Sequence, residues 1–293
     1  MEYLVRHRTT YRYLQDVSNS RHLAHLRPRG TPTQKVTRHV LAVTPEPAQR
    51  VRRKDFFGNG AEWLAMDEPH GTFDILAESQ VSAMPAPWRD GAASEAWETV
   101  RTRLDRPESA AARDAVQFAF DSALTAFTAD LASYARVGFA PGRALLEAAI
   151  DLMGRIHADF RYDTTVTDAS TPIDRVFEIR AGVCQDLAHI GIAAMRSLGL
   201  PARYVSGYLL TQPPPGRPRL LGADASHAWF SVWAPPFGWV DLDPTNNVLP
   251  SEEHITLAWG RDYSDVAPIN GIVTGGGDHV IEVGVDVIPM ERI

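Results

Sequence analysis

Apolar and polar residues alternate along much of the first 85 positions, which is the pattern of strands with one buried face. The alternation, with many Thr, Val and Tyr residues, covers 3–13, 34–45 and 71–83. Residues 53–66 predict two more strands joined by a Gly-Asn-Gly turn. The proline-containing stretch 84–88 breaks the pattern and predicts a linker. We therefore expect an N-terminal antiparallel β domain over residues 1–100.

From about residue 108 the apolar residues recur every three or four positions and alanine becomes frequent, which predicts helices. This spacing covers 107–124, 127–135 and 141–160. A further helix is predicted to begin near Cys184, with one apolar stripe formed by Leu187, Ile190, Ala194 and Leu198. Gly199 suits the position just past the end of this helix, and Pro201 prevents its continuation.

Strand patterns return after this helix. They cover 203–210, 226–234, 239–245 and 279–289. A proline-rich loop over 211–219 and a turn over 235–238 are expected between the first three. In the last strand one apolar face is formed by Ile281, Val283, Val285 and Val287. The expected fold class is α+β, with residues 101–293 forming a second domain that includes these C-terminal strands.

Composition narrows the possible partners and compartment. The formal net charge of -7 gives no electrostatic reason to expect nucleic acid or an anionic membrane as a partner. Residues 1–11 carry charges where a signal peptide needs an apolar run, and no stretch approaches the roughly 20 apolar residues of a spanning helix. With a single cysteine in addition, we expect a cytoplasmic protein.

The lone Cys184 is the first candidate for chemistry. One cysteine cannot form an internal disulfide, so it is either a small buried hydrophobic residue or a nucleophile. Because Cys184 is predicted to open a helix, unpaired backbone N–H groups and the helix dipole favour its thiolate form. A thiolate nucleophile also needs an imidazole beside it, and a group that orients the imidazole.

The two strands of 226–245 offer such a pair. In a tight antiparallel hairpin with Trp233 opposite Phe237, His227 lies opposite Asp243, where side chains on neighbouring strands are in contact range. A register shifted by two residues pairs His227 with Asp241 instead. The alternation therefore restricts the orienting acid to these two aspartates, and spacing alone does not choose between them.

Three segments in this order resemble the bacterial transglutaminase-like family of the papain-like superfamily. They are AGVCQDLAHIGIAAMRSLGLPARYVSGYL, DASHAWFSVW and GWVDLDPTNN. The resemblance extends to YLVRHRTTYRY, LRPRGTPTQ and DFFGN in the N-terminal region, and to GRDYSDVAPINGIVTGGG near the C-terminus. It therefore covers nearly the whole chain.

The resemblance implies a papain-like core in which the helix that carries Cys184 packs on an antiparallel sheet. It implies Cys184 as nucleophile, His227 as base and Asp243 as the orienting carboxylate, with the Cys184 backbone N–H as first oxyanion donor and the second donor unassigned. The implied activity is that of a cysteine hydrolase or acyltransferase acting on amide bonds of a peptide or protein through a Cys184 thioester. Water as acceptor gives a cysteine protease or amidase, which we favour because water needs no dedicated site. An amine acceptor gives a transglutaminase or ligase.

A non-catalytic peptide-binding module on the same scaffold is the alternative of another class, and an intact set of three residues argues against it. No metal-ligand motif is present, so we expect no required metal and no cofactor. His189, Gln185 and Asp186 are expected to support the helix or nearby loops, and Trp229 and Trp239 to lie in the core or a cleft wall. The sequence assigns neither an oligomeric state nor a role for the N-terminal domain.

Overall fold

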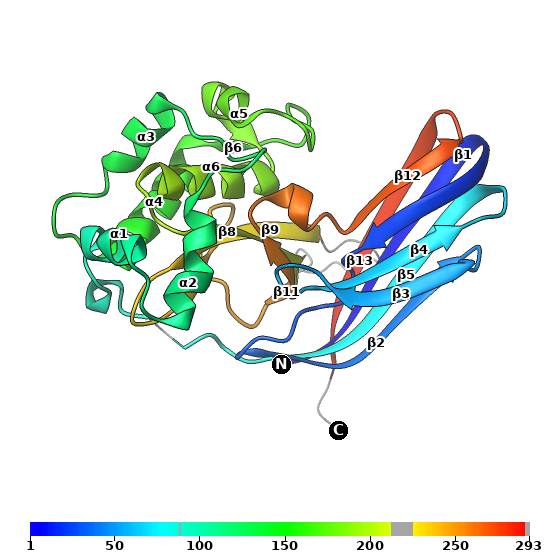
Figure 1. Cartoon of the computed structure of the whole chain (residues 1–293), viewed down its shortest axis with the longest axis horizontal. Helices are drawn as coiled ribbons and strands as arrows, with labels where there is room; N and C mark the ends of the chain where they lie inside the picture. Colours follow the sequence, from blue (N-terminus) through cyan, green and yellow to red (C-terminus); the bar gives the residue numbers. More distant parts are fainter. Residues whose placement is uncertain (88, 212–224, 291–293) are drawn as a thin grey trace, which may run out of the picture.

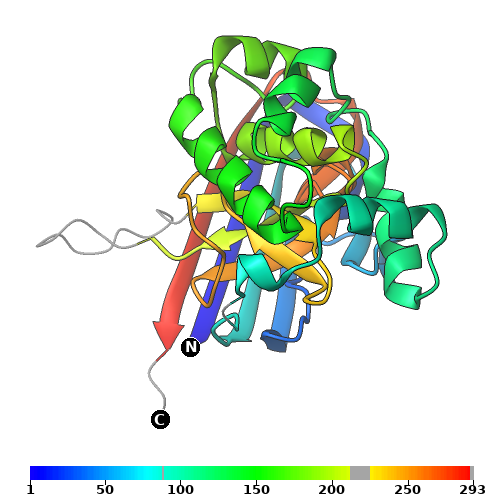
Figure 2. The same ribbon diagram turned by 90° about the vertical axis from the view of Figure 1, so that its left-hand side faces the viewer.

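The chain folds into a helical lobe and a large β-sheet, with a smaller sheet between them (Figure 1). This computed structural model describes residues 1–87, 89–211 and 225–290. The turned view shows the helices gathered on the side of the small sheet that faces away from the large one (Figure 2). The proline-rich loop expected over 211–219 falls almost entirely outside the described residues.

The large sheet confirms the strands predicted for the first third of the chain. Its N-terminal strands are β1 (Glu2–Ala24), β2 (Gln34–Thr44), β3 (Gln49–Lys54), β4 (Gly60–Met66) and β5 (His70–Ala83). They are antiparallel, in the order β2-β5-β1-β4-β3. Strand β5 alternates buried and less buried residues along almost its whole length, as its sequence predicts. Strand β1 extends beyond the segment 3–13 in which its sequence alternates. It pairs first with β5 and then, past an irregularity after Arg12, with β4.

Two C-terminal strands complete this sheet. They are β12 (Ile269–Gly275) and β13 (His279–Met290), and both pair with β1 in antiparallel fashion. The expected division at residue 100 grouped these strands with the second domain, whereas their hydrogen bonds lie in the N-terminal sheet. Alternation predicts that a segment is a strand but does not predict which strand it pairs with. Only Val285 and Val287 of the predicted apolar face are buried, because that end of β13 packs toward the small sheet.

The helices are α1 (Trp97–Asp105), α2 (Ala110–Val116), α3 (Ala129–Arg136), α4 (Leu145–Asp159), α5 (Ile173–Ile179) and α6 (Cys184–Ser197). Helices α1 and α5 escape the sequence pattern because they are short, and α1 buries only Val100. Helix α6 begins and ends as predicted, with Gly199 at φ +75° just beyond it. In the described part of the chain, no helix combines the length and apolar character needed to cross a membrane.

The small sheet has the order β10-β9-β8-β11. Its strands are β8 (Ala202–Leu209), β9 (Ala225–Trp233), β10 (Trp239–Leu242) and β11 (His254–Gly260). Helix α6 packs on β9, and a Cβ at Gly191 would lie 2.6 Å from the Phe230 ring. Glycine therefore allows the close approach of helix and sheet that places the start of α6 near the start of β9. A two-stranded pair, β6 (Arg161–Tyr162) and β7 (Ala181–Gly182), precedes α6.

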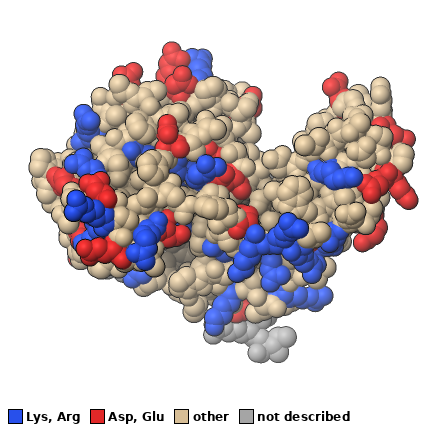
Figure 3. All heavy atoms as spheres, viewed as in Figure 1, with Lys and Arg blue, Asp and Glu red and all other residues tan. Residues whose placement is uncertain are grey.

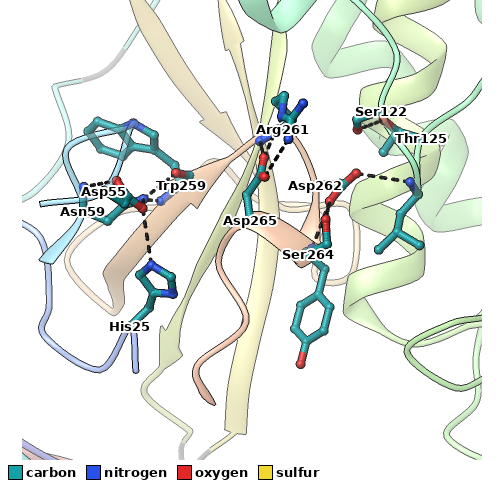
Figure 4. A network of polar contacts seen from close by, with 12 residues as sticks. His25, Asp55, Asn59, Ser122, Thr125, Trp259, Arg261, Asp262, Ser264 and Asp265 are labelled. Atoms are coloured by element: carbon teal, nitrogen blue, oxygen red, sulfur yellow. Dashed lines mark hydrogen bonds and ion pairs between the residues drawn. The ribbon is translucent and has the colours of Figure 1, made fainter. Parts of the chain in front are cut away.

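Polar contacts join β11 and the segment after it to the large sheet and to the helical lobe (Figure 4). The fully buried Asn59, from the turn between β3 and β4, exchanges hydrogen bonds of 2.8 and 3.0 Å with the backbone of Trp259 in β11. In the segment after β11, Arg261 pairs with Asp265, and the buried Asp262 accepts from the Leu124 and Ser264 backbone N–H groups. These bonds give residues 260–265 a structural role.

Basic side chains gather in the lower middle of one face of the molecule (Figure 3). Strand β3, an edge of the large sheet, carries Arg50, Arg52, Arg53 and Lys54. Arg50 and Arg52 pair with Glu62 on the neighbouring strand, at 2.6 and 3.3 Å. Charge on an edge strand opposes edge-to-edge association of sheets, which is sufficient physical reason for the basic residues of β3.

Candidate active site

Cys184 is the first residue of α6 and is half-buried. The turn before it is fixed by Asp186, whose carboxylate accepts from the Val183 backbone N–H at 2.8 Å and from Thr167 Oγ1 at 2.7 Å. Gly182 is required here, because a Cβ at this position would lie 2.5 Å from the Asp186 carboxylate. The sulfur thus sits where the unpaired N–H groups of the first helical turn and the positive end of the helix dipole favour an anion.

His227 of β9 and Asp243, just past β10, are in direct contact. His227 Nε2 lies 2.7 Å from Asp243 Oδ2, and both residues are buried. The register differs from the predicted one: Trp233 pairs with Trp239, not with Phe237. The turn is therefore two residues longer than a tight hairpin, and Asp243 reaches His227 from a diagonal position. A shift of two residues preserves the face of each strand, so the restriction to Asp241 or Asp243 still holds.

Asp243 accepts an unusually complete set of hydrogen bonds. Its Oδ2 contacts His227 Nε2, His254 Nε2 at 3.0 Å and Asn246 Nδ2 at 2.7 Å, while Oδ1 accepts from the backbone N–H groups of Thr245 and Asn246. Burial opposes ionisation, but the hydrogen bonds from His227 and His254 hold the pKa of Asp243 far below its ordinary value. Because the carboxylate is ionised, both imidazole Nε2 atoms must donate protons to it.

His254 and Asn246 are the site residues that sequence reasoning missed. His254 begins β11, a strand that the alternation did not predict, and its ring meets the Trp229 ring edge-on at 5.3 Å between centroids. Asn246 follows the Asp-Pro-Thr motif directly. The only sequence signal for either is its type and its closeness to a motif residue, so a structure is needed to bring them together.

The electrostatics of His227 favour its charged form. Burial alone would lower its pKa, but hydrogen bonds with Asp243 and Cys184 raise the pKa to about 9. Since Nε2 faces Asp243, Nδ1 is the nitrogen left for the sulfur. The imidazolium is therefore stable at neutral pH beside a sulfur at a helix start, an arrangement that suits a thiolate–imidazolium pair.

His227, Asp243 and His254 also satisfy the distance criterion for a metal site. Their three ligand atoms lie within 4.8 Å of one another, and they are the only such group among the described residues. The same atoms, however, hydrogen bond to each other, and each Nε2 carries the proton it donates. A metal ion would have to displace both protons, so this donor set fits a hydrogen-bonded cluster better than a resident metal.

The residues expected to support the helix or nearby loops form contacts around the site. Gln185 donates to the Ala169 carbonyl at 3.2 Å, and the buried His189 accepts from the Tyr263 backbone N–H at 3.2 Å. Burial lowers the pKa of His189 to about 4, so its ring is neutral at physiological pH. Trp229 is fully buried against His227 and His254. These contacts support the helix and the loops around the site.

Comparison with known proteins connects this geometry to a family. Residues 3–82 match the bacterial transglutaminase-like N-terminal region, and residues 133–244 match the transglutaminase-like superfamily. The chain is 41% identical over 297 residues to an uncharacterized protein of Mycobacterium tuberculosis, covering 99% of this chain and 93% of that one. An uncharacterized protein of Mycobacterium leprae is 32% identical over 292 residues, with 96% of each chain covered.

Two further similarities bear on the fold and the chemistry. A crystal structure of a proposed cysteine protease from Cytophaga hutchinsonii superposes with a TM-score of 0.74 at 21% identity, covering 100% of this chain and 92% of that one. The protein-glutamine gamma-glutamyltransferase of Pseudomonas aeruginosa is 32% identical over 147 residues, which cover 48% of this chain and 22% of that protein. The structural match establishes the overall fold.

Proposed function

The chain belongs to the bacterial transglutaminase-like family, and from this premise we propose that it is a cysteine-dependent enzyme that breaks amide bonds by acyl transfer. The observation that carries the proposal is the 2.7 Å hydrogen bond between His227 and the buried, ionised Asp243, on a ring that also hydrogen bonds to Cys184 at a helix start. Without a chemical use, there is little reason to bury an imidazole and a carboxylate beside the only thiol of the chain.

In the proposed reaction, the Cys184 thiolate attacks the carbonyl carbon of an amide. The tetrahedral oxyanion is stabilised by backbone N–H groups at the start of α6, beginning with that of Cys184. The His227 imidazolium, through Nδ1, gives its proton to the departing amine as the C–N bond breaks, and a thioester remains on Cys184. Asp243 holds the ring in place through Nε2 and stabilises its positive charge.

The thioester is then released by a second nucleophile. We propose water, which His227, now neutral, deprotonates at Nδ1 as it attacks; the C–S bond breaks, and the products are a carboxylic acid and the regenerated thiolate–imidazolium pair. The substrate is then a peptide or protein, and the enzyme a peptidase or amidase. A primary amine in place of water would form a new amide, as expected of a transferase such as the Pseudomonas aeruginosa protein that is similar in sequence to part of this chain.

A peptide library incubated with the protein, with and without added primary amine, tests both outcomes. Hydrolysis predicts products with new carboxyl groups. Transfer to the amine predicts products that carry the added amine in a new amide bond, in place of ammonia if a side-chain amide reacted or in place of the departing peptide if a peptide bond reacted. The control is Cys184→Ala, which should give neither product. If no peptide is changed by wild type in either condition while its thiol remains reactive, the protein is better explained as a peptide-binding module.

A further inference from the structure

A cavity of about 550 Å³ lies beside the candidate active site but does not include Cys184, His227 or Asp243. Its wall is formed by the small sheet, by the segment around Thr33 and by the linker after β5. Three indoles line it, those of Trp229, Trp239 and Trp259. The volume and the aromatic lining are those of a small-molecule site.

The cavity contains a buried arginine whose side chain forms no ion pair with a described residue. Arg203 of β8 is only 6% exposed, and its guanidinium lies 4.2 Å from the Trp239 ring centroid and 3.7 Å from that of Trp259. Within the described ranges it forms no hydrogen bond or ion pair, and its buried Nε has no partner. A buried guanidinium normally finds carboxylates or carbonyls for its donors, so an orphaned one is costly and requires explanation.

The surroundings keep Arg203 charged but leave its buried Nε without a hydrogen-bond partner. Burial lowers the pKa of Arg203. The carboxylate of Asp241 opposes this, the Arg29 guanidinium adds to it, and the Asp114 carboxylate opposes it more weakly; both aspartates also line the cavity. An arginine remains protonated at neutral pH even so. Two further polar atoms near this face of the sheet are also buried and unpaired: Trp229 Nε1 in the cavity wall, and Ser231 Oγ on the residue paired with Arg203 across β8 and β9.

We propose that this cavity binds a small organic carboxylate, whose anionic group pairs with Arg203 and whose apolar body rests against the tryptophans. A carboxylate matches the planar guanidinium in shape and can accept two of its N–H bonds at once. The aromatic wall favours an apolar body over a bare inorganic anion. His254 also lines the cavity while it donates to Asp243, so the ligand would sit one side chain away from the proposed catalytic group.

Tryptophan fluorescence of the full chain tests the proposal, because three of the indoles line the cavity. Phenylacetate is the probe, phenylacetamide is its neutral counterpart, and inorganic phosphate is an anion without an apolar body. We expect a saturable fluorescence change with phenylacetate, with a dissociation constant of about 1 mM or lower. Phenylacetamide should bind at least about tenfold more weakly, since it carries no negative charge and offers the guanidinium one acceptor oxygen in place of two.

Variants locate the binding. Arg203→Met should weaken phenylacetate binding by at least about tenfold, and Arg203→Lys, which keeps the charge but loses the planar fork, should weaken it less. Arg101→Met is the matched control: Arg101 also stacks on an indole, that of Trp97 at 5.0 Å, but neither residue lines the cavity, and its loss should leave binding unchanged.

Several results would overturn the assignment. These are no saturable fluorescence change with phenylacetate in wild type, phenylacetamide binding as tightly as phenylacetate, a saturable fluorescence change with phosphate but not with phenylacetate, or unaltered phenylacetate binding in Arg203→Met. Thermal unfolding of each variant shows whether it is folded. If Arg203→Met does not fold, Arg203→Lys and the comparison of acid with amide on wild type still decide the outcome.

Discussion

Replacing Asp243 by asparagine should slow alkylation of Cys184 at acidic pH. The Asp243 carboxylate and Cys184 together raise the pKa of His227 from 6.5 to about 9, which corresponds to roughly 3 kcal/mol of stabilisation of the imidazolium. Asparagine keeps the shape but removes the charge, so a large part of this stabilisation should be lost, and with it the proton that holds the thiolate in a pair at pH 6.

The assay is iodoacetamide labelling followed by mass, in which every cysteine adduct reports on Cys184 because it is the only thiol. At pH 6 a free cysteine is only about 0.3% thiolate, so wild type should react much faster than free cysteine. Asp243→Asn should reduce the wild-type rate by about tenfold to a hundredfold, in proportion to a loss of roughly 1.4 to 3 kcal/mol.

The matched control is Asp241→Asn. Asp241 shares the strand face with Asp243, but it pairs across the hairpin with Ser231 and does not contact His227. Its replacement should leave the labelling rate near that of wild type. Equal rates in wild type and Asp243→Asn would refute the electrostatic reasoning, and a slow Asp241→Asn with a fast Asp243→Asn would show that the wrong aspartate was chosen.

Further predictions concern turnover, the second imidazole, metals and stability. On any amide substrate that turns over, Cys184→Ala should show no activity, whereas Asp243→Asn should keep measurable residual activity. The thiolate at a helix start is partly stabilised without the carboxylate. Equal losses of activity in the two variants would contradict this. His254→Phe removes one hydrogen bond to Asp243, and it should lower kcat by about tenfold and narrow the pH range of activity. A change in folding stability alone, with an unaltered pH profile, would assign His254 a purely structural role. EDTA should not alter labelling of Cys184, while excess Zn²⁺ should slow it by replacing the two Nε2 protons; loss of labelling in EDTA would instead show a required metal. Because the folded pKa of His227 is raised, its contribution of up to roughly 3 kcal/mol is complete below pH 6.5 and lost as pH rises to about 9, so urea unfolding should show wild type losing stability over this window and His227→Gln losing less.

Much of the fold follows from the sequence because local patterns and burial agree there. Strand β5 has one face in a core and one outside, so its residues alternate, and α6 carries a single apolar stripe that ends at Gly199. Strand β11 was missed for the opposite reason. It is buried on both faces, with Ile255 and Leu257 in one core cluster and Ala258 in another, so its sequence has no alternation to detect.

The site was predictable to the extent that it depends on strand faces. Parity along two strands restricted the acid to Asp241 or Asp243 and survived a wrong register, since a shift of two residues leaves every side chain on the same face. The contact of Asp243 with His254 and the position of Arg203 between two indoles depend on how β10, β9, β8 and β11 are ordered in the small sheet. Pairing of distant strands is not encoded in local spacing.

The central claim is that Cys184 carries an acyl group during the reaction, and an activated ester tests it most directly. Wild type mixed with p-nitrophenyl acetate should release nitrophenol in an initial burst, and mass analysis of the quenched protein should find one acetyl group on the peptide that contains Cys184. Asp243→Asn should acylate more slowly and Cys184→Ala should neither burst nor acquire the adduct. A wild-type protein without the acetyl group on Cys184, or a burst that persists in Cys184→Ala, would contradict the account.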